Sequence, residues 1–345
     1  MQRQLHALVA TPGGPPGAIV TLRSGRRTAV LRAGVADVRS GRRPRATDHM
    51  RIASVAKAFN AAVVLRLVAC GRLRLADTIG KRLPGLPRAW AAVTVRQMLG
   101  HTSGLPDYTQ SNGFRMQFRT DPSGYVSPGR VISWVRSDPL AFRPGSRYEY
   151  SNTDNIVLGL IAQRVTRAPY ARLLRGLIFR PLGLRRTSFP SRPPLPRPFI
   201  HGYSTAPGQP PEDVSTLLSP SGAWASGAIV STPFDLGRFI RAYLSGRLVP
   251  ARLQRLQLRF VRGGNSSPPG PGANAAGLGI FRYRSRCGTV YGHTGSFPGY
   301  VQWAAATRDG RRAVTSSFNI PALTGELLTH LRQAQATAVC ALLRG

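Results

Sequence analysis

The chain has 345 residues, 42% of them hydrophobic, which is enough to bury a sizeable core in one large domain or two smaller ones. Its 48 Lys and Arg against 13 Asp and Glu give a formal net charge of +35, which first suggests a polyanionic partner such as nucleic acid. The cationic residues are spread along the whole chain and nearly all are Arg, so biased codon usage accounts for the excess better than a binding patch does. We therefore expect no nucleic-acid partner, only a weak attraction to anionic cell-wall polymers or lipids.

The first residues, MQRQLHALVATPGG, lack the apolar segment of a secretory leader. No run is long enough to span a membrane, since Arg66 interrupts AAVVLRLVAC. The chain is thus either cytoplasmic or lacks a leader that it once had. Its three cysteines, Cys70, Cys287 and Cys340, do not have the spacing of a metal site, and its six histidines stand far apart, so we expect neither metal nor cofactor.

In chain order, residues 17–46 alternate apolar and polar segments around Gly-Arg turns, which predicts a β-hairpin or meander. The pattern changes at Ala53, where SVAKAFNAAVVLRLVACGRL has helical periodicity and stops at Gly71. Helical patterns continue in VTVRQMLGHTSG, PGRVISWVRS and NTDNIVLGLIAQRVT, and Pro- and Gly-rich loops follow. Strand patterns return in AGLGIFRYRS, GTVYGHTG, YVQWAAATRDG and RRAVTSSFN, before a final amphipathic helix, TGELLTHLRQAQATAVCALLRG.

Strands therefore lie at both ends of the chain and helices fill its middle. This order predicts an α+β fold in which one antiparallel sheet is built from both ends, flanked by terminal helices, with a mostly helical lobe inserted. We expect one domain over residues 1–345. Its α/β lobe would comprise residues 1–58 and 220–345, and its helical lobe residues 59–219.

Lys57 is one of only two lysines, and it follows Ser54 by three residues. If a helix begins near Ala53, both side chains lie on one face, close to the free N–H groups and the positive end of the helix dipole. A buried lysine can lose its proton near neutral pH, whereas arginine cannot. We interpret Ser54 as a nucleophile and Lys57 as its base, although Ser-x-x-Lys also arises by chance. Lys81, in a polar turn, is expected to be a surface charge.

Tyr150-Ser151-Asn152 precedes an apolar helix. A tyrosine beside cationic groups can have a lowered pKa and relay protons, and Asn152 can orient a substrate carbonyl or hold Lys57. The alternative is that Tyr150 belongs to the core and that Ser151 or Asn152 caps the helix.

His293-Thr294-Gly295 stands at the end of a predicted strand. Gly295 would let a substrate backbone lie against the strand, Thr294 supplies a hydroxyl, and His293 supplies a donor or a cation. The N–H of Ser296 could pair with that of Ser54 as an oxyanion hole. The alternative is a tight turn at a strand end.

Together these three motifs resemble the serine β-lactamase and penicillin-binding hydrolases, whose pattern is Ser-x-x-Lys, then Tyr-x-Asn or Ser-x-Asn, then Lys/His-Thr-Gly. The Tyr-Ser-Asn and His-Thr-Gly forms are similar to the class C-like branch, peptidase family S12, with the Streptomyces-type D-alanyl-D-alanine carboxypeptidases nearest. The resemblance implies a β-lactamase/transpeptidase-like fold. It also implies a serine hydrolase that forms an acyl-enzyme with D-alanyl-D-alanine peptides of peptidoglycan or with β-lactams.

The resemblance implies that Ser54 is acylated, that Lys57 accepts its proton, and that Tyr150 relays protons to the leaving amine and from the deacylating water. The residues expected to contact substrate are Asn152, His293, Thr294, Gly295, Ser296 and, as an aromatic wall of the cleft, Trp224. For Trp224 a place in the core is the alternative. The resemblance further implies a Cys287–Cys340 disulfide, a secreted protein and a buried thiol at Cys70.

One segment departs from the carboxypeptidase pattern. Where those enzymes have an arginine that holds the terminal carboxylate, this chain has Phe281 in GLGIFRYRSRCG. Strand alternation turns Arg282 to the opposite face unless a one-residue bulge intervenes. Strict carboxypeptidase activity is therefore in doubt, and the alternatives are an amidase or esterase of the same fold, or a non-catalytic penicillin-fold protein that binds cell-wall fragments.

Overall fold

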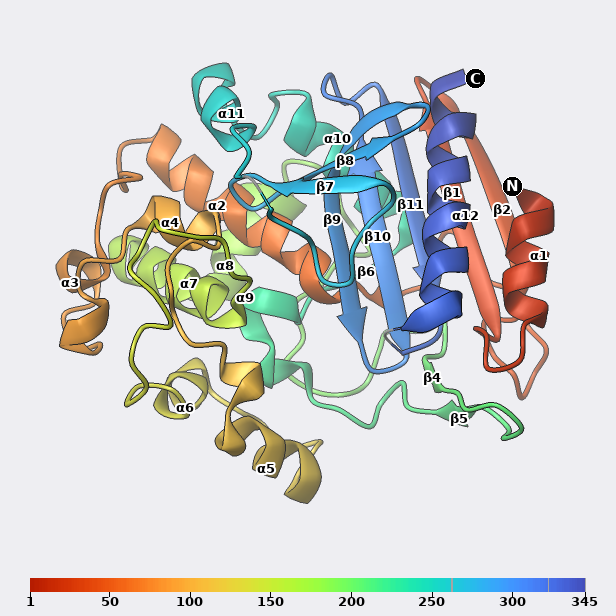
Figure 1. Ribbon diagram of the computed structural model, residues 1–345, viewed down its shortest axis with the longest axis horizontal. Helices are drawn as coiled ribbons and strands as arrows, with labels where there is room; N and C mark the ends of the chain where they lie inside the picture. The colour runs from red at the N-terminus through yellow and green to blue at the C-terminus, as the bar shows by residue number, and fades with distance from the viewer. Residues whose placement is uncertain (262, 322, 345) are drawn as a thin grey trace.

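A computed structural model of the protein describes residues 1–261, 263–321 and 323–344. In these ranges seven strands form one antiparallel sheet in the order β2-β1-β11-β10-β9-β8-β7 (Figure 1). The strands are β1 Gly17–Ser24, β2 Arg27–Gly34, β7 Ala273–Ala276, β8 Phe281–Ser285, β9 Gly288–Phe297, β10 Tyr300–Ala306 and β11 Arg312–Phe318. Since β1 pairs with β11, strands from the two ends of the chain meet within one sheet, and the expected α+β architecture is confirmed.

Helices surround this sheet and fill the middle of the chain. In chain order they are α1 Gln2–Ala10, α2 Ala56–Ala69, α3 Ile79–Arg82, α4 Val95–Leu99, α5 Asn112–Thr120, α6 Pro128–Ser133, α7 Asn152–Thr166, α8 Tyr170–Leu174, α9 Trp224–Gly227, α10 Pro233–Leu244, α11 Ala251–Gln257 and α12 Gly325–Arg344. Two short antiparallel pairs join β3 Met50–Arg51 to β6 Val230–Ser231, and β4 Tyr203–Ser204 to β5 Glu212–Asp213. The boundaries that we drew between two lobes stay a prediction.

The sheet is covered on both faces. The terminal helices α1 and α12 lie against one face, where Leu5 and Leu331 pack with Val20 of β1 (Figure 1). The next strand residue, Ile19, points the other way into the larger core that includes Phe239 of α10. This alternation is the period-2 pattern of a strand buried on both sides, and it explains why the first half of β1 is apolar and fully buried.

Helix α2 runs through the centre of the helical region, and most of its residues are buried. It packs against α7 and α9, and Phe59 stacks on Phe239 with ring centroids 3.5 Å apart. A helix buried on most sides is apolar on most of its surface, and α2 is so apart from Lys57, Asn60 and Arg66. The turn before its N-terminus packs between β9 and α9.

Cys287 and Cys340 form a disulfide, with Cα atoms 5.1 Å apart, that ties the turn before β9 to α12. The buried thiol expected at Cys70 is wrong, since this residue caps the C-terminal end of α2 and is exposed. The apolar pattern of α2 suggested that the whole helix is buried, but its C-terminal end reaches the protein surface. Among the described residues, no helix combines the length and the apolarity needed to cross a bilayer.

Candidate active site

The Ser54 turn lies between the sheet and α2. Residues Ala53–Val55 form a single 3₁₀ turn, and α2 begins directly after it at Ala56. Ala53 has φ +49°, a left-handed conformation that costs free energy in a residue with a Cβ and that is found mainly where function demands it. The β3–β6 pair fixes the entry to this turn through Arg51↔Val230. Ser54 is thus presented, half-buried, at the start of the helix.

Lys57 reaches back along the helix to Ser54, as the i, i+3 spacing predicts. Its Nζ lies 2.8 Å from Ser54 Oγ, 2.7 Å from Asn152 Oδ1 and 2.9 Å from the carbonyl oxygen of Ser226. The side chain is almost completely buried, at 1% exposure. Burial lowers the pKa of Lys57 to about 7, and the negative charge of Asp107 partly offsets this shift by raising the pKa. A substantial fraction of this amine is therefore neutral at physiological pH.

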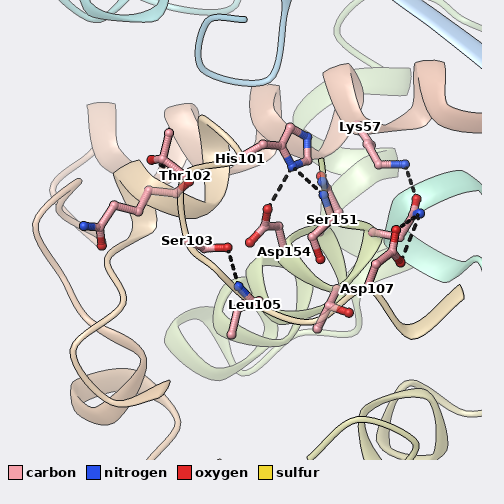
Figure 2. Close-up of polar contacts among 12 residues, drawn as sticks. Lys57, His101, Thr102, Ser103, Leu105, Asp107, Ser151 and Asp154 are labelled. Atoms are coloured by element: carbon pink, nitrogen blue, oxygen red, sulfur yellow. Dashed lines mark hydrogen bonds and ion pairs between the residues drawn. The ribbon is translucent and has the colours of Figure 1, made fainter. Parts of the chain in front are cut away.

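Asn152, the first residue of α7, connects Lys57 to a carboxylate. Its Oδ1 accepts from Lys57, and its Nδ2 donates to Asp107 Oδ2 at 2.9 Å (Figure 2). These two contacts fix the orientation of the amide, because only the Oδ1 atom can accept. Asp107 was not anticipated from the sequence, because nothing local in GLPDYT distinguishes it from a turn aspartate. Ser151 is the N-cap by position, but its side chain makes no capping hydrogen bond.

Tyr150 lies beside this network. Lys57 Nζ is 5.0 Å from the centroid of the Tyr150 ring, and the hydroxyl is buried. The lowered pKa that we expected for Tyr150 is wrong, because burial raises its pKa well above the ordinary value and outweighs the effect of the nearby Ser54 hydroxyl. Tyr150 is consequently a neutral phenol that can donate a proton.

The strand carrying His293, Thr294, Gly295 and Ser296 is the end of β9. Beyond Gly292, which pairs with Phe281, β9 is no longer paired to β8, and its open edge packs against the Ser54 turn. A Cβ on Gly295 would meet the Ile52 oxygen at 2.6 Å and the Ser54 nitrogen at 2.9 Å. The glycine that we expected to make room for substrate also makes room for the turn that carries Ser54.

His293 is completely buried in this strand. Its Nδ1 lies 2.5 Å from the Thr294 carbonyl, its ring packs edge-on against Phe281, and its Nε2 has no partner among the described residues. Burial, helped by Lys57, lowers the pKa of His293 to about 3. Of the two roles that we considered for His293, donor or cation, a neutral imidazole fits only the donor. The Thr294 hydroxyl donates to the Pro268 carbonyl at 2.6 Å.

A cleft of about 440 Å³ opens over these groups. Ser54, Tyr150, Asn152 and Ser296 line its floor, and α5 and its neighbours supply an aromatic side formed by Tyr108, Phe114, Phe118 and Trp134. Among the described residues that line it, no Lys or Arg is present, although the chain carries 48 of them. The two charged side chains of the lining are acidic, Asp107 and Asp121.

Trp224 does not line this cleft. Its ring packs against Tyr170, with centroids 4.9 Å apart, and a Cβ on Gly159 of α7 would touch it at 2.6 Å. The geometry favours the core alternative for Trp224. Its neighbours Ala223 and Ser226 do line the cleft. The segment that we expected at the cleft is therefore there, but the Trp224 side chain is not part of the lining.

Phe281, which we expect at the position of the carboxypeptidase arginine, begins β8. The β8–β9 register is continuous from Phe281↔Gly292 to Ser285↔Gly288, so the bulge that would have turned Arg282 around is absent from this described segment. Phe281 is buried against His293, and the Arg282 guanidinium lies over the Phe260 ring, 4.8 Å from its centroid. Arg282 therefore does not face the cleft.

Comparisons with known proteins agree with this geometry. The family model described as "Beta-lactamase" matches residues 5–338. A D-stereospecific amidohydrolase from Streptomyces sp. superposes with a TM-score of 0.84 at 33% identity, with 97% of each chain covered. D-amino acid amidase from Ochrobactrum anthropi SV3 also gives 0.84, at 26% identity over 99% of this chain and 97% of that one.

Among curated sequences, Protein flp of Staphylococcus aureus is 31% identical over 197 residues, which are 54% of this chain and 38% of flp. The chain thus matches well under half of the length of that relative. With the Ser54–Lys57–Tyr150 geometry and a family model that matches nearly from end to end, the chain belongs to the β-lactamase family of serine hydrolases.

Proposed function

We propose that the protein hydrolyses amide bonds of small D-configured substrates through an acyl-enzyme on Ser54. The observation that carries the proposal is the environment of Lys57 Nζ. A neutral amine has two N–H donors and one lone pair. Here the donors find two acceptors, Asn152 Oδ1 and the Ser226 carbonyl, and the lone pair is left for the Ser54 hydroxyl at 2.8 Å.

Acylation begins when Lys57 accepts the Ser54 proton and Oγ attacks the substrate carbonyl. The N–H of Ser54, at the start of the helix, and the N–H of Ser296, on the open edge of β9, are the proposed donors to the oxyanion. The leaving amine needs a proton to depart. Tyr150 is a neutral phenol next to Ser54, so it donates that proton and recovers one from the ammonium of Lys57.

Deacylation reverses these proton transfers with water in place of the amine. Water gives its proton, by way of Tyr150, to Lys57 and attacks the ester carbonyl, and Ser54 leaves with a proton from the lysine. Since the pKa of Lys57 is about 7, the amine can both take and return a proton near neutral pH. Both steps use only water and the side chains of Ser54, Lys57 and Tyr150.

The charge of the cleft supports an uncharged or amine-bearing substrate rather than a carboxylate. Carboxypeptidase substrates and β-lactams both carry an anionic group that needs a cationic or strongly donating partner. The charged side chains that line this cleft are acidic, and beneath it Phe281, which we expect at the arginine position, and the neutral His293 are both buried. The D-stereospecific amidohydrolase and D-amino acid amidase, which share the fold over almost the whole chain, support the same substrate class.

The aromatic side of the cleft supports a bulky apolar substrate side chain. Phe114, Phe118 and Trp134 present ring faces and edges within one cluster, and burying an aromatic group against them contributes about 2 kcal/mol or more. We therefore propose D-phenylalanine amide or a similar amide as the preferred class.

The test is a comparison of turnover on D-phenylalanine amide, L-phenylalanine amide, a peptide ending in D-Ala-D-Ala, a cephalosporin and a p-nitrophenyl ester. The proposal predicts the highest kcat/KM on the D-amide. Preference for the D-Ala-D-Ala peptide or the cephalosporin would instead assign a carboxypeptidase or a β-lactamase. Turnover of the ester alone would assign an esterase. No turnover and no label from a fluorescent penicillin on Ser54 would leave a non-catalytic binding protein.

The Cys287–Cys340 disulfide supports a protein that works outside the reducing cytosol. Mass analysis of the protein isolated from its own cell under thiol-blocking conditions tests this. The proposal predicts an intact disulfide, and two blocked thiols in its place would contradict it.

A further inference from the structure

His101, which none of the reaction steps uses, contacts three consecutive residues around Tyr150. Its ring lies on the Tyr150 ring, with centroids 4.4 Å apart and planes 30° apart. Its backbone oxygen accepts from the Glu149 N–H at 2.9 Å, and its Nδ1 lies 3.4 Å from the Ser151 nitrogen. His101 itself has φ +52°, a left-handed conformation that a residue with a side chain adopts only where its surroundings enforce it.

Asp154 of α7 fixes the imidazole from below. Its Oδ2 lies 2.8 Å from His101 Nδ1, and both side chains are buried, at 0% and 3% exposure (Figure 2). The other carboxyl oxygen, Oδ1, is buried without a hydrogen-bond partner in the described residues. If the carboxyl group were ionised, burying this oxygen without a hydrogen bond would cost considerable free energy.

The Ser151 N–H is directed at Nδ1, so Nδ1 is assigned as an acceptor and the proton of the pair is assigned to Asp154. Burial agrees with this assignment: it raises the pKa of the Asp154 carboxyl well above its usual range, against a hydrogen bond from Ser103, and together with Lys57 it lowers the pKa of His101 to about 3. The carboxyl O–H donates to Nδ1, which also faces the Ser151 N–H. The titratable groups that face the pair are Lys57, Asp107, Tyr148, Tyr150 and His293.

We propose that His101 is a positioning residue that holds the Tyr150 phenol against Ser54, and that Asp154 orients His101 for this task. The inference rests on the proposed role of Tyr150 in proton transfer. The phenol hydroxyl has no hydrogen-bond partner of standard geometry in the described residues, so the stacked ring and the clamped backbone on either side set its place. Misplacement by about 1 Å is enough to cost a reaction about 100-fold.

The experiment measures single-turnover acylation of Ser54 by D-phenylalanine p-nitroanilide, whose leaving amine needs a proton, together with the Tm of each variant. His101→Ala removes both the stacked ring and the Nδ1 contacts, and we expect its acylation rate to fall by about 10- to 100-fold while the apparent Kd for the anilide changes less than about twofold. His101→Phe keeps a stacked ring and is expected to recover part of the rate. Asp154→Asn keeps an N–H donor for Nδ1 and is expected to retain most of the rate, unlike Asp154→Ala.

The control is a substitution of buried Ile161, which lies on α7 two turns after Asp154. Of Ile161→Val and Ile161→Ala, the variant used is the one whose loss of Tm matches that of His101→Ala. Wild-type acylation by His101→Ala, or an equal rate loss in the matched Ile161 variant, would overturn the positioning role. A collapse of Asp154→Asn to the level of Asp154→Ala would overturn the role of Asp154. Absence of acylation in the wild-type protein would be a different failure, that of the proposed function.

Discussion

The position that a Cβ of Gly295 would take lies 2.9 Å from the backbone nitrogen of Ser54. The strand that carries His293 and Thr294 and the turn that carries Ser54 thus touch backbone to backbone. In the mechanism that we propose, this contact sets the spacing of the Ser54 and Ser296 N–H groups, and it requires a glycine at position 295.

Gly295→Ala should therefore push the Ser54 turn away from β9. The added methyl group would also meet the Ile52 oxygen at 2.6 Å. Because this oxygen belongs to the backbone, only a shift of the backbone can relieve the clash. We expect acylation to slow by about 100-fold and stability to fall by about 1–3 kcal/mol. Single-turnover kinetics and urea unfolding measure the two effects.

Gly176→Ala is the matched control, because nothing lies within 4 Å of the Cβ that it would add and its φ is not in the left-handed region. This variant should keep the wild-type rate. Equal rates in Gly295→Ala and Gly176→Ala would show that the contact has no part in catalysis.

Lys57→Arg should abolish detectable acylation even though it keeps a positive charge. Arginine stays protonated in proteins and cannot accept the Ser54 proton, and loss of a general base costs about 10²- to 10⁴-fold. The measurement is covalent labelling of Ser54 by a fluorescent penicillin or an active ester. Labelling at close to the wild-type rate would show that the lysine acts only through its charge.

On the acidic side, the pH dependence of kcat/KM should follow the titration of Lys57. Because the reactive form of Lys57 is the neutral amine, the rate should rise with pH through a midpoint near 7. The pKa of Tyr150 lies well above 10, so the phenol keeps its proton and no fall is expected on the basic side until the pH is far above neutral.

Asp107→Asn should shift that midpoint to lower pH. The Asp107 carboxylate favours the protonated lysine and raises its pKa, so removal of the charge lowers it. The asparagine can still accept from Asn152 Nδ2, which keeps the geometry. At pH values below the wild-type midpoint the variant is expected to be the faster enzyme. A shift to higher pH would contradict the sign of this coupling.

Loss of the Cys287–Cys340 disulfide should destabilise the protein by about 4 kcal/mol, the chain-entropy value for a closed loop of this length. The two cysteines are 53 residues apart in sequence. Paired Cys→Ser variants and urea unfolding measure the loss. Native protein should offer one accessible thiol, at Cys70, and a finding of three thiols after oxidative expression would remove the claim.

Local spacing accounts for what could be predicted from the sequence. Ser54 and Lys57 meet because an i, i+3 pair meets on any helix, and the sheet follows from strand patterns at both ends of the chain. Asp107, His101 and Asp154 escaped notice because their roles arise only when a loop and α7 are packed together.

The direction of a pKa shift was the least predictable property. The sequence showed cations around Tyr150 and suggested a lowered pKa, but burial determines the sign there, and sequence patterns do not report how deeply one tyrosine is buried. The same holds for His293. The sequence likewise did not show which way the Trp224 ring points: the segment around it reaches the cleft, but the ring packs against Tyr170.

The most direct test of the central claim is the titration of Lys57 itself. The chain has two lysines, so selective ¹³C or ¹⁵N labelling of lysine side chains gives two NMR signals, and Lys81→Arg assigns them. Lys81 is a surface residue paired with Asp77 at 3.0 Å, and this substitution leaves the active site intact. The account predicts a Lys57 midpoint near pH 7, and a midpoint near the ordinary lysine value of 10.5 would contradict it.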